Sequence, residues 1–125
     1  MRVFQSLSDS EMEIMQEIWR VEPPVTSNQL MAVFAHKAWK AQTMSTFLTR
    51  LVDKGLLMVE RKGKTNAYTP AVTQEEYHKR EARHMIDSMY HGSLLDFLAA
   101  FYGGKGISPD EARELKAWFE QEVEK

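Results

Sequence analysis

The hydrophobic pattern of the chain changes its period at Gly55. An apolar stripe at helical spacing comes before this glycine and is formed by Met44, Phe47, Leu48, Leu51 and Val52. After it, residues 56–61 form a short apolar segment that is compatible with a β-strand, and residues 62–66 form a polar segment typical of a turn. Residues 67–69 return as a second strand, which Pro70 ends. The sequence therefore predicts a helix closed by a glycine and followed at once by a small basic hairpin.

Two more helix starts precede this helix. Ser8 and Glu11 have the spacing of a capping box, and Thr26 and Gln29 repeat it. We expect the first helix to turn Ile14, Met15, Ile18 and Trp19 inward and to stop before Pro23-Pro24. The second should turn inward Leu30, Val33 and Phe34.

The rest of the chain is predicted to be helical. Thr73 and Glu76 form a third capping box that opens a long helix, which we expect to run to about Tyr90. Ser93 opens a short helix, and a glycine-rich break follows at residues 103–106. Ser108 and Pro109 then start the last helix. The predicted fold is mainly α, with a winged helix-turn-helix of three helices and a β-hairpin wing in residues 1–72, and a helical dimerisation domain in residues 73–125.

Charge is divided unevenly between these two parts, although the net charge of the whole chain is only −2. Residues 1–72 hold nine Lys or Arg and seven Asp or Glu, whereas residues 73–125 hold seven and eleven. Within residues 37–64, seven basic side chains stand against two acidic ones. This distribution favours an anionic partner for the first part and another role for the second, with an ordinary solvated surface as the alternative.

Composition excludes several classes of protein. The chain has no Cys, which rules out a disulfide framework, a Cys-ligated metal site and a thiol nucleophile. No run approaches the ~18 apolar residues of a membrane span, and the start has no signal-peptide pattern, so we expect a cytoplasmic protein without a membrane partner. No nucleophile elbow, phosphate loop or metal triad is present, so neither an enzyme nor a cofactor is expected.

A surface for duplex DNA is the function that these elements favour. The face of the third helix away from its stripe is polar, and short polar groups near a helix start can bond base edges or phosphates in a major groove. The residues predicted to read DNA are Gln42, Thr43, Ser45, Thr46 and Arg50. Cations before this helix and on the hairpin are predicted to meet backbone phosphates, namely Lys40, Arg61, Lys62 and Lys64. The alternative is a winged-helix module that binds protein instead of DNA.

The second part carries more apolar side chains than three short helices can cover. We expect a second copy of the chain to bury them, because removing apolar surface from water is favourable by roughly 25 cal/mol per Å². Packing against the first domain of the same chain is the alternative. The residues predicted to form the dimer interface are Met85, Met89, Leu94, Leu95, Phe97, Leu98, Phe101, Trp118 and Phe119.

The chain resembles the penicillinase and methicillin-resistance repressor family of BlaI and MecI type, which also includes the copper-responsive CopY branch. The similarity runs from about Leu7 to Glu122, and its most characteristic piece is residues 49–55, Thr-Arg-Leu-Val-Asp-Lys-Gly, placed after Trp39. The resemblance implies a homodimeric repressor that sits on palindromic operators of resistance or stress genes. The resemblance also implies that Thr43, Thr46 and Arg50 contact DNA, because these residue types match the family at these positions.

The sequence departs from the family at points that bear on its regulation. The family often reads Ser-Pro-Lys-Thr where this chain reads Lys-Ala-Gln-Thr at residues 40–43, so the operator sequence is not transferable. Better-known members are inactivated by a regulatory protease at an Asn-Phe bond, and the aligned pair here is Ala100-Phe101. The copper branch senses metal through cysteines, which this chain lacks. The four histidines are expected to be ordinary surface residues, not a metal site.

Overall fold

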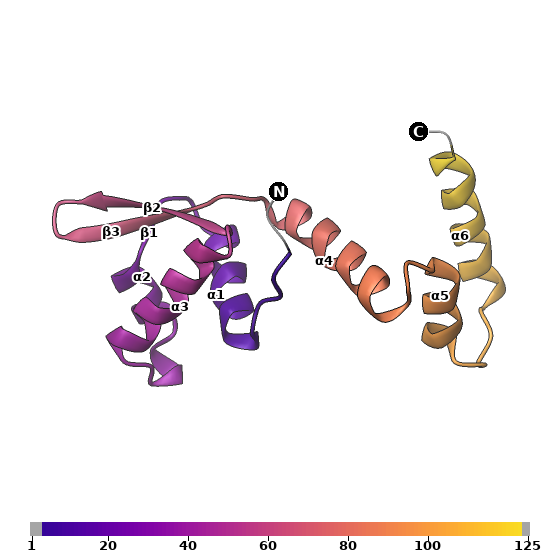
Figure 1. The fold of residues 1–125 in the computed structure, drawn as a ribbon, viewed down its shortest axis with the longest axis horizontal. Coiled ribbons are helices and arrows are strands. Elements are labelled where there is room, and N and C mark those ends of the chain that lie inside the picture. Colours follow the sequence, from indigo (N-terminus) through magenta and orange to yellow (C-terminus); the bar gives the residue numbers. More distant parts are fainter. Residues whose placement is uncertain (1–3, 124–125) are drawn as a thin grey trace. The chain divides into compact units, whose positions relative to one another are not determined.

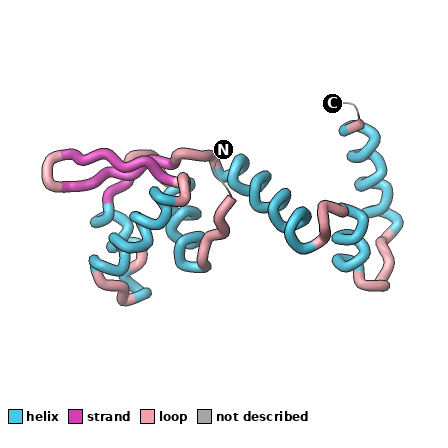
Figure 2. Tube along the Cα trace, in the orientation of Figure 1, coloured by secondary structure: helices cyan, strands magenta, loops and turns pink. Residues whose placement is uncertain are grey.

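The computed structural model describes residues 4–123 and assigns to them six α-helices, one 3-10 helix and one antiparallel sheet (Figures 1 and 2). The chain divides into two compact units, Met1–His84 and Met85–Lys125. Within the described residues, no helix is long and apolar enough to cross a membrane. The first unit contains α1 (Asp9–Arg20), α2 (Ser27–Val33), the 3-10 helix η1 (Ala35–Lys37) and α3 (Ala41–Asp53), and its last residues, up to His84, belong to α4 (Gln74–Met89).

Reciprocal hydrogen bonds fix the starts of α1 and α2, as the two capping boxes predicted. The Glu11 amide donates to the Ser8 hydroxyl at 3.2 Å, and the Ser8 amide donates to the Glu11 carboxylate at 2.8 Å. The same pair of bonds joins Thr26 and Gln29, at 3.2 and 2.7 Å. Both boxes are local, because each satisfies amides that the helix itself leaves unpaired within its first turn.

The core of the first unit is built by three helices and the sheet. The stripe of α3 faces it, with Met44, Leu48 and Leu51 fully buried against residues of α1. One expectation was wrong: Val33 is 46% exposed, whereas Phe34 is 8% exposed. The reason is that α2 ends at Val33 and η1 follows, so the turn between them, and not the helical period, decides which side chain enters the core.

The sheet has three strands in the order β1-β3-β2. β2 (Leu57–Lys62) and β3 (Thr65–Pro70) form the predicted hairpin, with Lys62 opposite Thr65 at its closed end. β1 (Val25–Thr26) joins the other side of β3, a strand that the sequence analysis missed because two residues are too short to show alternation.

Two glycines permit the turns at the ends of β2. Gly55 ends α3 at a φ of 85°, and Gly63 lies in the hairpin turn at a φ of 66°. Both values fall in the left-handed region, which residues with a Cβ rarely adopt. The predicted break in period at Gly55 is therefore confirmed.

Three helices complete the chain, α4 (Gln74–Met89), α5 (Leu94–Tyr102) and α6 (Pro109–Glu122). The start of α4 is part of the first unit and contributes Tyr77 to its core, where the ring centroid of Tyr77 lies 5.8 Å from that of Trp19. The Trp19 indole also donates to the Val72 carbonyl at 3.0 Å. The domain boundary expected after residue 72 stays a prediction. The chain divides into its two compact units between His84 and Met85.

Candidate nucleic-acid interface

The face of α3 opposite its buried stripe is polar and reaches solvent. Gln42, Ser45 and Arg50 are exposed, whereas Thr43 and Thr46 are half-buried. The side chain of Arg50 forms no hydrogen bond or ion pair with another described residue. The face thus offers an amide, hydroxyl groups and a guanidinium, which are the groups that bond base edges and phosphates.

The hydroxyl of Thr46 is already engaged within the helix. It donates to the Gln42 carbonyl at 3.0 Å, one turn earlier. Its hydrogen is thus unavailable to a base, although the oxygen can still accept and the methyl group can still make apolar contacts. The amide of Gln42 keeps both of its donors and its acceptor.

The start of α3 is open to an anion. Lys40 is the N-cap residue, and its side chain makes no capping hydrogen bond. The first-turn amides therefore lack a side-chain acceptor, and they lie at the positive end of the helix dipole. The exposed Lys40 ammonium adds charge of the same sign at this place.

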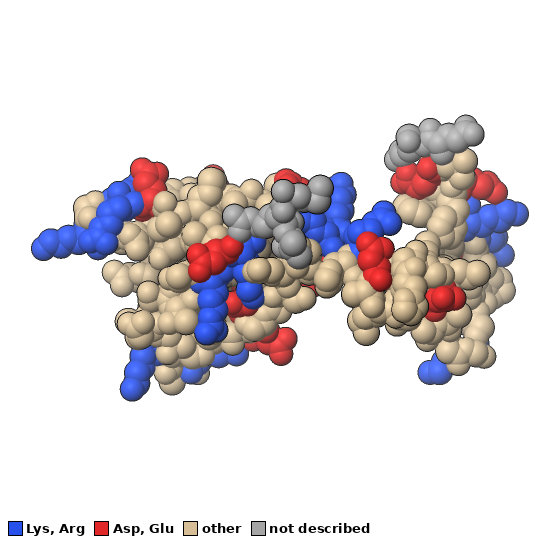
Figure 3. Space-filling model, in the orientation of Figure 1, with Lys and Arg blue, Asp and Glu red and all other residues tan. Residues whose placement is uncertain are grey.

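The wing formed by β2 and β3 presents three exposed cations, and Lys and Arg side chains project from its tip in Figure 3. Arg61 donates through Nε to the Gly63 carbonyl at 3.0 Å, which folds its side chain over the turn. No described carboxylate forms an ion pair with Arg61, Lys62 or Lys64. Their charges are therefore left for an external anion.

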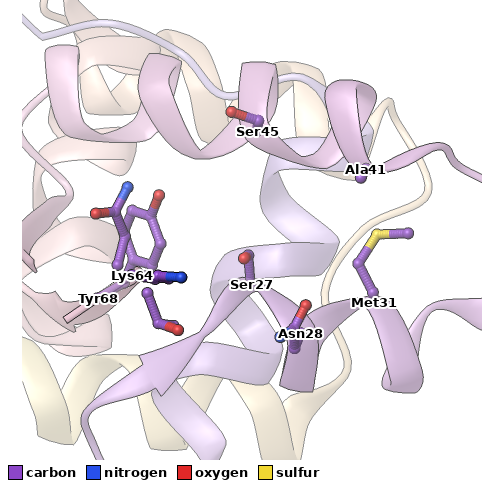
Figure 4. Close-up of a pocket in the computed structure, with 9 residues that line it drawn as sticks. Ser27, Asn28, Met31, Ala41, Ser45, Lys64 and Tyr68 are labelled. Atoms are coloured by element: carbon purple, nitrogen blue, oxygen red, sulfur yellow. The ribbon is translucent and has the colours of Figure 1, made fainter. Parts of the chain in front are cut away.

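The beginning of α3 and the wing border one cavity of about 230 Å³, which lies next to the start of α2 (Figure 4). Ala41 and Ser45 line it from α3, Ser27 and Asn28 from α2, and Lys64 and Tyr68 from the hairpin. The predicted reading helix and the predicted wing therefore flank a single depression in the same unit.

Two basic residues of the same segment serve a structural purpose. Lys54 donates to the Glu11 carboxylate at 2.7 Å and to the Ser6 carbonyl at 2.8 Å. The side chain of Glu11 is 2% exposed and that of Lys54 is 20% exposed. Lys37 likewise lies 3.0 Å from the Glu13 carboxylate. These two ion pairs join η1 and the end of α3 to α1. The ammonium groups of Lys37 and Lys54 are therefore already paired and are not available to bind DNA.

The Glu11 carboxyl is held in its charged form. Burial by itself raises its pKa, but the hydrogen bond from Lys54, the bond from the Ser8 amide and the charge of Lys54 together outweigh burial. The pKa of Glu11 therefore lies below its ordinary value of 4.5. The sequence predicts only a capping role for Glu11, because a partner 43 positions away leaves no local signal.

The histidines of the described residues do not gather with other ligands. No group of three or more His, Cys, Asp or Glu side chains there could hold a metal ion. His78 instead lies 3.4 Å from Glu81, and His84 stacks on Phe4 with ring centroids 4.6 Å apart.

The second unit leaves its apolar side chains uncovered. No residue between Met85 and Val123 is buried. Of the residues predicted for the dimer interface, six are exposed and three are half-buried, the latter being Met85, Phe97 and Leu98. Leu95 is 75% exposed and Trp118 is 53% exposed. A groove of about 850 Å³ between α5 and α6 has Leu98, Leu115 and Phe119 in its walls.

Comparison with known proteins places these features in one family. The model of a family described as penicillinase repressor matches residues 7–121. The penicillinase repressor of Bacillus licheniformis is 27% identical over 115 residues, which are 92% of this chain and 90% of that protein. The methicillin resistance regulatory protein MecI of Staphylococcus aureus (strain N315) is 26% identical over 110 residues, 88% of this chain and 89% of the relative.

Two solved structures resemble the first part of the chain. The solution structure of the DNA binding domain of the repressor BlaI matches with a TM-score of 0.53 and 29% identity, covering 62% of this chain and 94% of that one. The solution structure of the Bacillus licheniformis BlaI monomeric form in complex with the blaP half-operator matches with a TM-score of 0.50 and the same identity and coverage. These similarities agree with the predicted winged-helix architecture.

Proposed function

The chain belongs to the penicillinase repressor family, and from this premise we propose that it is a transcriptional repressor that binds operator DNA and occludes it. The first unit binds the DNA, and the second joins two copies. The operator is a palindrome, and the regulated genes serve resistance or stress. The Bacillus licheniformis relative whose structure contains a half-operator supports this assignment.

The observation that carries the proposal is the common border of α3 and the wing. Both elements line one cavity, so a helix placed in the major groove brings the wing to the neighbouring backbone. An arrangement on opposite sides of the unit would leave either the bases or the phosphates without a partner.

Each element then has a distinct task. The polar face of α3 reads bases through Gln42, Thr43, Ser45 and Thr46, and Arg50 supports it further along the helix. Lys40 and the cations of the wing bind phosphates, which position the helix without reading sequence. The ion pairs of Lys37 and Lys54 hold the helices in register with α1.

Dimerisation follows from the composition of the second unit. Its side chains enclose no buried core within the described residues, and exposed patches of this kind usually mark an interface. Pairing two copies removes this apolar area from water at roughly 25 cal/mol per Å². It also places two reading helices about 34 Å apart, or a multiple of that distance, which matches the repeat of a palindromic site.

The experiment is a titration of the protein against a labelled duplex from the region upstream of its own gene, repeated at several salt concentrations. We expect a complex whose affinity falls steeply with salt, because each neutralised phosphate contributes about 0.9 to the slope of log K against log salt. The double variant Lys62→Ala, Lys64→Ala should lower that slope by about 2 and keep the same unfolding transition. An unchanged slope would show that the wing does not touch DNA, and the absence of any complex at low salt would overturn the proposed function.

A further inference from the structure

We propose that the cavity between α2, α3 and the wing is a seat for one phosphate group. The inference rests on the proposed function, because it identifies this group as a phosphate of the DNA backbone. Lys64 is predicted to act on the wing and Ser45 on the reading helix. Ser27, Asn28 and Tyr68, for which the sequence predicts no contact with DNA, complete the cavity.

The lining has the chemistry that an anion requires. Lys64 is the only charged residue among the nine that line the cavity, so a positive charge stands there without a carboxylate beside it. The remaining polar lining offers hydroxyl and amide donors, such as those of Ser27, Ser45 and Asn28. About 230 Å³ accommodates a phosphate together with some of its water, since one water occupies about 30 Å³.

Tyr68 adds one more donor to the lining. The residue is only 6% exposed, because its ring belongs to the core. Its hydroxyl makes no hydrogen bond to another described residue, and because no buried side-chain oxygen among them lacks a partner, the hydroxyl reaches solvent in the cavity. Figure 4 shows the phenol rising from the sheet toward α3. The hydroxyl can therefore donate a charge-assisted hydrogen bond to an anionic oxygen that enters the cavity.

The position of the cavity explains why DNA supplies the phosphate. Ser45 lies on the helix that reads bases, and Lys64 lies on the wing beside it. A phosphate between these two elements fixes both at once. The seat therefore sets how α3 is registered along the groove, as backbone contacts do in general.

A matched pair of charge substitutions tests the seat without disturbing the fold. Asn28 lines the cavity and is exposed in the first turn of α2, a turn that holds no acidic residue. Asn28→Asp therefore suits the helix dipole and places a carboxylate where the phosphate would bind. Gln29→Glu adds the same charge at the next residue, outside the cavity lining, and preserves the capping box. We expect Asn28→Asp to weaken operator binding at least about tenfold more than Gln29→Glu.

Removing a single hydroxyl provides the second test. Tyr68→Phe keeps the ring in the core, and we expect operator binding to weaken about tenfold through loss of one bond to a charged group. Tyr77→Phe is the control, because that buried tyrosine lies outside the cavity and its hydroxyl meets the Leu7 backbone. Duplexes with one neutral methylphosphonate linkage then locate the phosphate. One linkage should weaken operator binding by the unaltered protein, and it should weaken binding by the Tyr68→Phe variant less, because that variant has already lost one bond to the same phosphate.

The outcomes separate the seat from the function. Equal binding by the Asn28→Asp and Gln29→Glu variants, with Tyr68→Phe binding as tightly as the unaltered protein, overturns the seat and leaves the repressor assignment standing. No binding by the unaltered protein overturns both. Inorganic phosphate, compared with chloride at equal ionic strength, identifies the source by amide shifts in NMR spectra. Saturable shifts around Asn28 extend the seat to free phosphate, whereas DNA effects without such shifts restrict it to the backbone.

Discussion

Removal of the Lys54 ammonium should destabilise the first unit more than the loss of any surface charge. Lys54→Met keeps the length and helix propensity of the side chain at the C-terminal end of α3. The substitution leaves the Glu11 carboxylate with only 2% of its side chain exposed and without its cation. The Ser6 carbonyl loses a donor as well.

The expected magnitude follows from the burial of the two partners. Breaking a buried ion pair from one side typically costs about 3–5 kcal/mol, whereas an exposed pair contributes about 0–1 kcal/mol. Since the side chain of Lys54 is 20% exposed, water can approach Glu11 once the ammonium is gone. We therefore expect a loss of about 2–3 kcal/mol, which lowers the melting temperature of a domain of this size by about 10–20 °C.

Urea denaturation of the full chain at pH 7, followed by tryptophan fluorescence, measures this loss. The double variant Glu11→Gln, Lys54→Met is the matched control, because it removes both charges, keeps an acceptor for the Ser8 amide in the capping box and should recover most of the stability. Lys79→Met is a second control, since the Lys79 and Glu75 side chains are 74% and 81% exposed and their ion pair should contribute little. A loss below about 1 kcal/mol for Lys54→Met would refute the reasoning, because it would show that the pair behaves like an exposed one.

The same pair predicts how stability depends on pH. The pKa of Glu11 in the folded protein lies below its ordinary value of 4.5, so its contribution is fully present above that value. The contribution is lost as the pH falls through the lowered pKa, because the unfolded chain binds the proton more readily. The unaltered protein should thus lose stability below about pH 4.5 more steeply than Glu11→Gln. Parallel pH profiles for the two proteins would contradict this assignment.

Three further outcomes are expected. Leu95→Glu should convert the dimer into a monomer in sedimentation equilibrium, because this side chain is 75% exposed in the single chain. Lys105→Glu, in the glycine-rich loop, should leave the dimer intact. A Leu95→Glu protein that is still a dimer would show that this face is not the dimer interface. Ser8→Ala should cost about 1 kcal/mol in denaturation, because it removes one half of a capping box, and no measurable loss would show that the box is dispensable. Gln42→Ala should change the preference among operator sequences by about 1–3 kcal/mol in a competition assay. Thr46→Val should change it less, because the Thr46 hydroxyl already donates within α3. A larger change for Thr46→Val than for Gln42→Ala would contradict the role of Gln42 in reading bases.

The elements that could be predicted are those fixed by neighbours in sequence. Capping boxes join residues three positions apart, as in Ser8 with Glu11, and an apolar stripe needs only one helical period. The starts of α1, α2 and α6 and the buried face of α3 were therefore foreseen. The predicted winged-helix architecture and the predicted family are also confirmed by the comparisons with known proteins. The choice of DNA-contacting and dimer-forming residues remains a prediction.

The features that escaped prediction depend on contacts between distant segments. β1 exists because Val25 pairs with Tyr68, and its own two residues carry no pattern. Val33 and Phe34 were both predicted to face the core, but the turn after α2 places only Phe34 there. Lys54 is one of the seven basic residues counted within residues 37–64, yet it bonds to Glu11.

Interactions between residues close in sequence thus determined where the helices begin, where the helical period of the apolar residues ends at Gly55 and which apolar face of α3 is buried. Tertiary structure alone decided which cations remain available, because an ion pair forms between side chains that folding brings together. It also created the cavity beside Tyr68, whose walls come from α2, α3 and the hairpin. The physical reason is that propensity and capping act within one helical turn, whereas burial and charge pairing act across any separation in sequence that the fold closes.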